Sequence, residues 1–398
     1  MSIYLNQLGI VCALGSGIDD VRQALFADTP SGVEPYACLG KTLHLGAVTS
    51  ELASQEALPP MLHSRNNALL LTALAQIRPA VDTAIARFGV ERIGVVLGTS
   101  TSGIGEAQAA IAQHQATGQL PLHFHIAQQE LGSPATALSS LLGLAGPAMV
   151  ISTACSSSAK AMASAARLLN AGMCDAVICG GVDSLCDFTV AGFSALESVS
   201  AERCQPMSIH RSGINIGEGA ALFLISKDLM QEKNTVALLG WGESSDAHHI
   251  SAPAPDGKGA STAMQAALHR AGLQASDIDY INLHGTATQQ NDAMESLAIN
   301  QVFGGQTPCS STKPLTGHTL GAAGAIEAAI CWLTLSGNPT GQLPPHWWDG
   351  ASDPAITPLA LVMPGQCTDT PLQYALSNSF AFGGSNAVLI FGKKHAAD

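Results

Sequence analysis

The sequence predicts an α/β fold with a largely parallel sheet, built from two similar halves that meet near residue 235. Short apolar runs typical of buried strands alternate with helical segments along the chain. The second half repeats the order of the first, and residues 384–391 share the Gly-x-x-Ala-x-Leu spacing of residues 217–224. A hydrophobic fraction of 46% with 40 glycines fits a large buried core with many tight turns.

The first half begins with a predicted strand at residues 3–14 and ends with a strand at 214–226 that follows a glycine turn. The elements between them are a helix at 16–27, a helix at 65–88, a strand at 92–98, a helix with a surface excursion at 100–129, a strand–turn–helix unit at 148–172 and a strand at 175–181. This alternation is typical of βαβ units.

The second half follows the same plan. Its predicted elements are a strand at 235–242, a helix at 259–271, a strand at 278–283, a helix at 292–303, a turn and small-residue helix at 310–329 and a final strand at 384–391. The unit at 310–329 parallels the one at 148–172. Because both helices consist of small residues, we expect them to pack closely at the centre of the molecule.

Composition excludes several classes of function. A net charge of −13 argues against nucleic acid or an anionic membrane as the main partner. The N-terminus lacks a signal peptide pattern, and no apolar run approaches membrane-spanning length. The ten cysteines contain no C-x-x-C pair, so a zinc site is not expected. We therefore expect a reduced, cytoplasmic protein.

One stretch combines a strand, a tight turn and a helix around a cysteine. Residues 148–152 form a short apolar run, Thr153-Ala154-Cys155 makes the turn, and an Ala/Ser-rich helix continues to Gly172. Helix N-termini favour anions, so we expect a lowered pKa for the Cys155 thiol and a nucleophilic thiolate. For this stretch alone, the alternative is a buried structural cysteine, since free cysteine often serves in packing.

Three turns in the second half present unusual groups near the ends of predicted strands. His284 follows the apolar run 280–283, His318 lies in a glycine-rich turn, and residues 380–386 form another glycine turn. A single histidine is more often a satisfied core or surface group than a catalytic one. Two histidines and a cysteine at such turns indicate a shared site, because open α/β sheets bind ligands at the carboxyl ends of strands.

The four motifs together resemble those of β-ketoacyl-acyl-carrier-protein synthases of the type I/II class. In chain order they read Thr-Ala-Cys155-Ser-Ser, Leu-His284-Gly-Thr-Ala-Thr, Ser-Thr-Lys313-x-x-x-Gly-His318 and Asn-Ser-Phe-x-Phe382-Gly-Gly-Ser-Asn. The resemblance covers the whole chain. It implies the thiolase fold, with duplicated βαβαβαββ halves in a five-layered α-β-α-β-α arrangement. Residues 1–235 would carry the nucleophile, and residues 236–398 the two histidines.

The resemblance also implies a reaction. Cys155 would take an acyl group from an acyl-carrier protein, with its own N–H and that of Phe382 as the oxyanion hole. His284 and His318 would stabilise the enolate formed when malonyl-carrier protein loses carbon dioxide. The enolate would then attack the acyl group and give a β-ketoacyl-carrier protein. The other implied positions are an electrostatic pair (Lys313 and Glu295), a gate (Phe382), and substrate or phosphopantetheine contacts (Thr286, Thr288, Ile104, Phe380, Gly383 and Gly384).

Neither a cofactor nor a metal is expected, because phosphopantetheine arrives on the carrier protein. The pairs His123/His125 and His248/His249 could bind metal, but nothing supplies the remaining ligands. The implied partners are acyl-carrier protein and either a second copy of this chain or a ketosynthase-like paralogue. Three acidic residues are expected to be structural: Asp183, Asp187 and Glu218.

Several residues depart from the pattern of housekeeping fatty-acid synthases. Ala381 stands in the gate loop where glycine is usual, Gln289 where proline is common, and Glu197 where a basic docking residue is frequent. Arg65 is a candidate docking residue. These departures favour a specialised polyketide or aryl-polyene synthase, working with a paralogue that lacks the cysteine. The alternative is a partner or chain-length-determining subunit with little condensing activity of its own.

Overall fold

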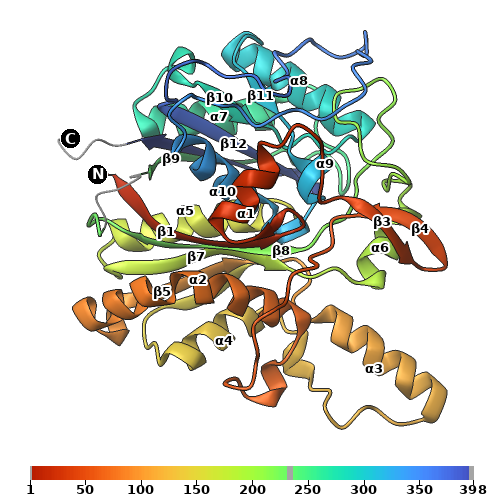
Figure 1. The fold of residues 1–398 in the computed structure, drawn as a ribbon, viewed down its shortest axis with the longest axis vertical. Helices are drawn as coiled ribbons and strands as arrows, with labels where there is room; N and C mark the ends of the chain where they lie inside the picture. Colours follow the sequence, from red (N-terminus) through yellow and green to blue (C-terminus); the bar gives the residue numbers. More distant parts are fainter. Residues whose placement is uncertain (1, 231–235, 394–398) are drawn as a thin grey trace.

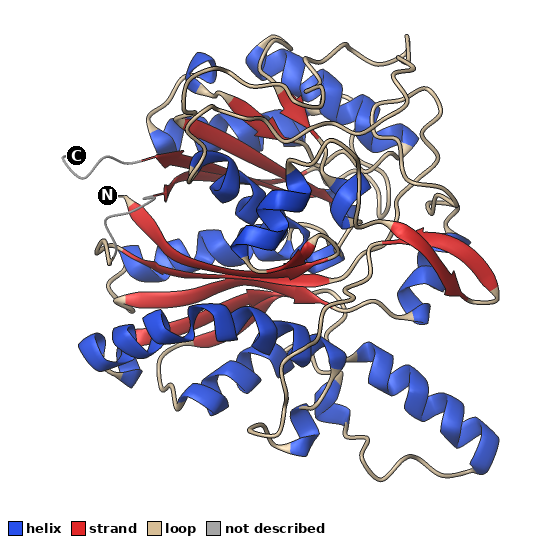
Figure 2. Ribbon diagram, in the orientation of Figure 1, coloured by secondary structure: helices blue, strands red, loops and turns tan. Residues whose placement is uncertain are grey.

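The computed structural model describes residues 2–230 and 236–393. A mixed β-sheet of eleven strands runs through the molecule (Figures 1 and 2). The strands of the first half are β1 (Ile3–Cys12), β2 (Gly15–Ser16), β5 (Ile93–Gly98), β6 (Ala148–Ile151), β7 (Ala176–Asp183) and β8 (Gly219–Ser226). Those of the second half are β9 (Val236–Ser245), β10 (Tyr280–Asn282), β11 (Cys309–Ser310), β12 (Tyr374–Ala381) and β13 (Ser385–Lys393). A separate hairpin consists of β3 (Glu34–Cys38) and β4 (Lys41–Leu45).

The two halves have the same strand order. It is β6-β5-β7-β8-β1 in the first half and β11-β10-β12-β13-β9 in the second. The halves join edge to edge, where Ile3 and Tyr4 of β1 pair with Leu238 and Ala237 of β9. The predicted duplication is therefore confirmed. The predicted boundary at residue 235 lies outside the described residues, so the boundary itself stays a prediction.

The helices connect these strands. They are α1 (Ile18–Leu25), α2 (Arg65–Phe88), α3 (Ile104–Thr117), α4 (Ser133–Leu142), α5 (Ser157–Asn170), α6 (Asp187–Ala195), α7 (Lys258–Ala271), α8 (Gln289–Phe303), α9 (Lys313–Thr316) and α10 (Ala323–Leu335). Short 3-10 turns lie at Pro60–Leu62, Val90–Arg92, Ile126–Gln128, Ala275–Asp277, Leu320–Ala322 and Phe382–Gly384. The predicted helices are all confirmed, whereas α4 and α6 were not predicted.

The elements form five layers, as the thiolase fold requires (Figure 1). Helices α2 and α4 cover the outer face of the first half-sheet, and α7 and α8 cover that of the second. Helices α5 and α10 lie between the two half-sheets. Each half thus buries one helical layer that it shares with the other half.

The two central helices pack closely because their contact residues are small. A Cβ atom placed on Gly324 of α10 would lie 2.9 Å from the Cβ and N atoms of Ala159 on α5. A Cβ atom on Gly98 of β5 would lie 2.3 Å from the backbone N of Ser158. The expectation that the small-residue helices meet at the centre is therefore confirmed.

The expectation of a largely parallel sheet is wrong. Within the described residues, parallel pairing is confined to the outer strands of each half, between β5 and its neighbours β6 and β7, and between β10 and its neighbours β11 and β12. The central strands β1, β7, β8, β9, β12 and β13 pair antiparallel with one another. The cause is the last strand of each half, which runs back beside the strand before it.

Helix α2 is long and apolar enough to cross a membrane by length and composition, contrary to the expectation from the sequence. In this fold it packs on β1 and β8 of the first half-sheet. Its buried face includes Leu70, Leu74, Ile77 and Val81. The polar exposed face and the sheet contact identify α2 as a core helix.

Candidate active site

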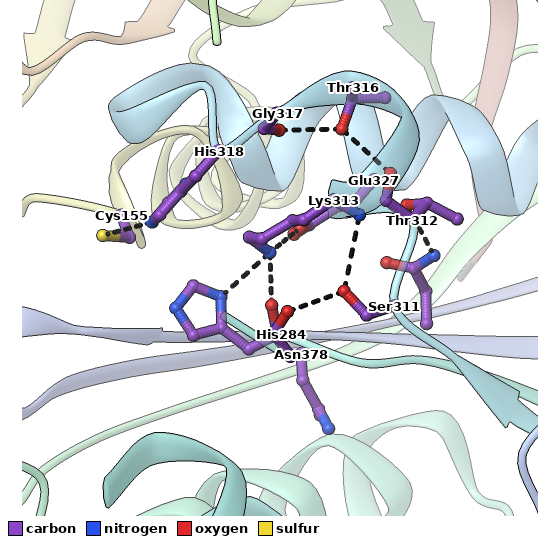
Figure 3. A network of polar contacts seen from close by, with 12 residues as sticks. Cys155, His284, Ser311, Thr312, Lys313, Thr316, Gly317, His318, Glu327 and Asn378 are labelled. Atoms are coloured by element: carbon purple, nitrogen blue, oxygen red, sulfur yellow. Dashed lines mark hydrogen bonds and ion pairs between the residues drawn. The ribbon is translucent and has the colours of Figure 1, made fainter. Parts of the chain in front are cut away.

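The three predicted catalytic side chains meet at one buried point between the halves (Figure 3). Cys155 lies just before α5, His284 follows β10, and His318 follows α9. The Sγ atom of Cys155 lies 3.0 Å from Nε2 of His318. The two imidazole rings stand edge to face with centroids 5.4 Å apart. Ligand atoms of all three residues lie within 4.8 Å of one another, so the predicted shared site is geometrically complete.

Each of these turns contains a non-glycine residue in the left-handed backbone region. The φ angle is 51° at Ala154, 61° at Ala287 and 51° at Leu320. Such conformations cost energy for residues with a Cβ atom and persist where the surrounding structure holds them. In this site they lie beside Cys155, in the His284 loop and beside His318. The packing of the two halves therefore sets the directions of the catalytic side chains.

The hydrogen bonds define which nitrogen of each histidine carries the proton. The Leu320 N–H donates to Nδ1 of His318 at 3.3 Å, and the Lys313 ammonium lies 3.4 Å from Nδ1 of His284. Because both Nδ1 atoms accept, each neutral ring carries its proton on Nε2. Burial, with the nearby Lys313 charge, also holds both histidine pKa values well below the usual range. Both rings are therefore neutral and can donate from Nε2 into the site.

The thiol of Cys155 is more buried than its position before a helix suggests. Burial raises its pKa to about 11, while the Lys313 charge and the N–H groups of Phe382 and Cys155 act in the opposite direction. The expected lowering of the pKa is wrong, because desolvation outweighs the helix N-terminus. The two N–H groups that approach the sulfur are nevertheless those expected for an oxyanion hole.

We predict a corresponding pH dependence for alkylation of Cys155 by iodoacetamide. Below a pKa of about 11, the thiolate fraction rises about tenfold per pH unit. The alkylation rate should therefore climb steeply and without a plateau between about pH 7 and pH 9. Peptide mass spectrometry measures this rate, with the exposed Cys367 as internal reference. A plateau near neutral pH would show that the thiolate is already formed there.

Lys313 and Glu295, the two residues expected to organise the site electrostatically, do not pair with each other. Lys313 pairs with Glu327 of α10 and also donates to the backbone oxygen of His284 (Figure 3). Glu295 instead accepts the N–H groups of His284 at 2.8 Å and Gly285 at 2.7 Å. Lys313 therefore orients the His284 ring, and Glu295 holds the backbone of the His284 loop. Burial raises the pKa of each carboxyl to about 7.

Two cavities meet at Cys155. The first is lined by Thr286, Thr288 and Phe380 together with both histidines, as expected for a pantetheine channel. The second is lined by Ile104 and by neither histidine. Cys155, Phe193 and Phe382 line both. Gly383 and Gly384 line neither cavity. They form the turn that carries Phe382, with φ angles of 80° and 72°.

Comparison with known proteins identifies the family. Residues 72–229 match the N-terminal domain and residues 236–347 the C-terminal domain of β-ketoacyl synthases. The chain belongs to the β-ketoacyl synthase family. It is 32% identical to a 3-oxoacyl-[acyl-carrier-protein] synthase 2 of Staphylococcus aureus, over 96% of this chain and 92% of that protein. The chain is a condensing enzyme of the acyltransferase class.

Solved structures agree with this family. A ketosynthase in complex with its chain length factor from Xenorhabdus doucetiae superimposes with a TM-score of 0.92 at 46% identity, over 99% of this chain and 98% of that one. The ishigamide ketosynthase/chain length factor has a TM-score of 0.85 at 26% identity, over 99% of both chains. The fold of this synthase is thus the thiolase fold in both halves.

One other prediction changes in the structure of the synthase. The candidate docking residue Arg65 binds the buried carboxylate of Glu218 at 2.5 Å, so its charge is already paired. Glu218 also accepts the N–H groups of Val48 and Leu185, as expected of a structural residue. Glu327 was not singled out from the sequence. No sequence motif marks Glu327 as the partner of Lys313. The two side chains meet because the chain turns between α9 and α10.

The described residues contain one cluster with metal-ligand geometry, namely Cys155, His284 and His318. A histidine that binds a metal through Nε2 must carry its proton on Nδ1. Here the Nδ1 atoms of both rings face N–H donors, which opposes that tautomer. The site is therefore built to donate hydrogen bonds and does not fit a metal. The pairs His123/His125 and His248/His249 belong to no such cluster in the described part of the chain.

Proposed function

We propose that this synthase acylates Cys155 and then elongates the acyl group with a malonyl thioester. The observation that carries the proposal is the convergence of the buried thiol with two neutral Nε2 donors. In the first step, Sγ bonds to the thioester carbonyl carbon and the carbon–sulfur bond to pantetheine breaks. The thiol proton ends on the departing pantetheine. The N–H groups of Cys155 and Phe382 stabilise the intermediate oxyanion.

In the second step, His284 and His318 bind the thioester oxygen of the malonyl group. Release of carbon dioxide leaves an enolate, whose negative oxygen accepts both Nε2–H donors. The enolate carbon bonds to the acyl carbonyl carbon, and the Cys155 thiolate leaves and takes up a proton from solvent to restore the thiol. Since Lys313 keeps the proton of His284 on Nε2, it supports this step without contacting the substrate.

Substitution of His284 should separate the two half-reactions. We expect His284→Ala to slow decarboxylation of malonyl-pantetheine about a hundredfold, because one of two enolate donors is lost. Acylation of Cys155 by acetyl-pantetheine should stay within about threefold of wild type, since its oxyanion donors are backbone groups. Released carbon dioxide and intact protein mass measure the two steps. Equal losses in both would contradict the assigned role.

We also propose a specialised polyketide or aryl-polyene pathway, and pairing with a ketosynthase-like paralogue that lacks the cysteine. Two relatives named above were solved as ketosynthase and chain length factor together, one of them 46% identical to this chain. Apolar side chains are also exposed on the surface that includes α3, among them Ile111, Leu122 and Ile126. A partner that covers them would complete this surface.

Co-expression with that paralogue tests the pairing. A stable one-to-one complex that elongates better than this chain alone is expected. A homodimer that elongates saturated chains unaided would contradict it. If Cys155 acquires no acyl group either in this chain alone or in the complex with the paralogue, the alternative of a chain-length-determining subunit is correct. We place the reaction in the cytoplasm, where malonyl- and acyl-carrier proteins reside.

A further inference from the structure

The ring of Phe382 stands between the two cavities of the active site. Both cavities are lined by Cys155, Phe193 and Phe382, and the Phe193 and Phe382 rings lie 5.8 Å apart. A thioester that enters past Thr288 reaches Cys155 from the first cavity. A long acyl chain must then extend into the second cavity, which contains Ile104. Phe382 therefore has to move for a long chain, whereas a short acyl group needs less room.

The loop that carries Phe382 is anchored on two sides. On one side, the Gly383 N–H donates to Ile250 O at 2.8 Å, and Gly384 O accepts from Asp246 N at 2.8 Å. On the other side, the loop reaches the nucleophile helix through Ser385. The Ser385 Oγ atom accepts from the Lys160 ammonium at 2.6 Å and from Ser156 Oγ at 3.1 Å.

This second anchor joins the gate to the nucleophile directly. Ser156 follows Cys155 in the chain, and Lys160 lies one helical turn further along α5. Both Lys160 and Ser385 are partly buried. A hydrogen bond from an ammonium group in such a place is stronger than one between neutral groups. In addition, the loop's two left-handed glycines allow it to rearrange once Ser385 is released.

We propose that Lys160, acting through Ser385, is a positioning residue that latches the Phe382 loop in the closed conformation. Closure has two effects on the function proposed above, on which this inference rests. It keeps the Phe382 N–H directed at Cys155, which serves the oxyanion step. It also keeps the Phe382 ring across the second cavity, which delays the entry of long acyl chains. The effect on the oxyanion donor applies to every acyl group, whereas the effect on the second cavity applies to long chains, so the latch sets the relative rates of long-chain and short-chain acylation.

Lys160→Met tests the latch, because it removes the ammonium and keeps the length of the side chain. The measurement is the single-turnover rate of Cys155 acylation by acetyl-pantetheine and by octanoyl-pantetheine, followed by intact mass. We expect the octanoyl-to-acetyl rate ratio to rise about three- to tenfold, as expected for loss of a charge-assisted hydrogen bond. Lys160→Arg retains a cation and should keep a ratio near that of wild type.

Further variants make the result specific. Ser385→Ala removes the acceptor and should raise the ratio as Lys160→Met does. The double variant should raise it no further, because both changes break the same contact. Lys258→Met, at an exposed lysine of α7, is the matched control and should leave the ratio unchanged. Condensation by acetylated Lys160→Met protein should slow, since the oxyanion donor is held less firmly.

The outcomes separate this inference from the proposed function. If wild type forms no acyl adduct with either thioester, the proposed function fails. If wild type is acylated but Lys160→Met and Ser385→Ala change both rates by the same factor, or change neither, the latch is wrong. A ratio shift in Lys160→Met that Ser385→Ala does not reproduce would also overturn it.

Discussion

Cys155→Ala is expected to abolish condensation, with a loss of at least about a thousandfold in the elongation rate. Among the cysteines of the described residues, Cys155 is the one that contacts both the Phe382 N–H and His318 Nε2, so no other thiol there is placed to form the acyl thioester. Intact mass spectrometry after incubation with acetyl-pantetheine should show an added acetyl group on wild type and none on the variant.

The same variant should continue to release carbon dioxide from malonyl-pantetheine. The enolate donors His284 and His318 do not require the thiol, and both keep their Nδ1 partners without it. Cys367→Ala, which removes an exposed thiol, is the matched control and should leave both activities unchanged. An acyl adduct on Cys155→Ala, or full elongation by it, would show that Cys155 is a structural cysteine.

Lys313→Met is expected to lower the free energy of unfolding by about 3–5 kcal/mol, because it leaves the carboxyl of Glu327 buried without its charge partner. Lys313 and Glu327 have side-chain exposures of only 2% and 4%. The second Glu327 oxygen already lacks a hydrogen-bond partner among the described residues. Loss of the ammonium therefore leaves both Glu327 oxygens without a hydrogen-bond partner among the described residues. Chemical denaturation measures the change.

Two further variants test whether the lost stability arises from the buried, unpaired charge. Lys313→Met with Glu327→Leu removes both members of the pair and should recover at least half of the loss, since no unpaired charge remains. Arg78→Met breaks the exposed pair between Arg78 and Asp82 and should cost less than about 1 kcal/mol. If the double variant is as unstable as Lys313→Met alone, the loss arises from the backbone contact to His284 and not from the buried charge.

Much of the fold was predictable because the signals are local. The run of apolar residues before Cys155 and the small residues after it mark β6 and α5. Helix α2 begins and ends at the predicted residues, with Ser64 as its N-cap. In contrast, β12 and the antiparallel direction of β13 were missed. The direction of a strand depends on the neighbours it meets, and those neighbours lie far away in the chain.

The residues of the candidate site also fall into two groups, those that could be predicted from the sequence and those that could not. Cys155, His284 and His318 could be predicted to share a site, because the four motifs together resemble those of β-ketoacyl synthases, whereas each turn alone left a structural role open. The partner of Lys313 could not be predicted. Glu295 and Glu327 are both glutamates on helices close to Lys313 in the sequence, so the sequence does not distinguish between them. Only the packing of α9 against α10 places Glu327 beside the ammonium. The contact between Lys160 and Ser385 could not be predicted from the sequence either, since the two residues are 225 positions apart.

The sequence by itself determined most of the secondary structure, the duplicated order of elements, and Cys155, His284 and His318 as the candidate nucleophile and its two histidines. These follow from periodicity, turn chemistry and short motifs, all of which act over a few residues. The tertiary structure decided strand directions, the partner of Lys313 and the raised pKa of Cys155. Each of these depends on burial and charge from groups distant in the chain, which meet only when the two halves close around the site.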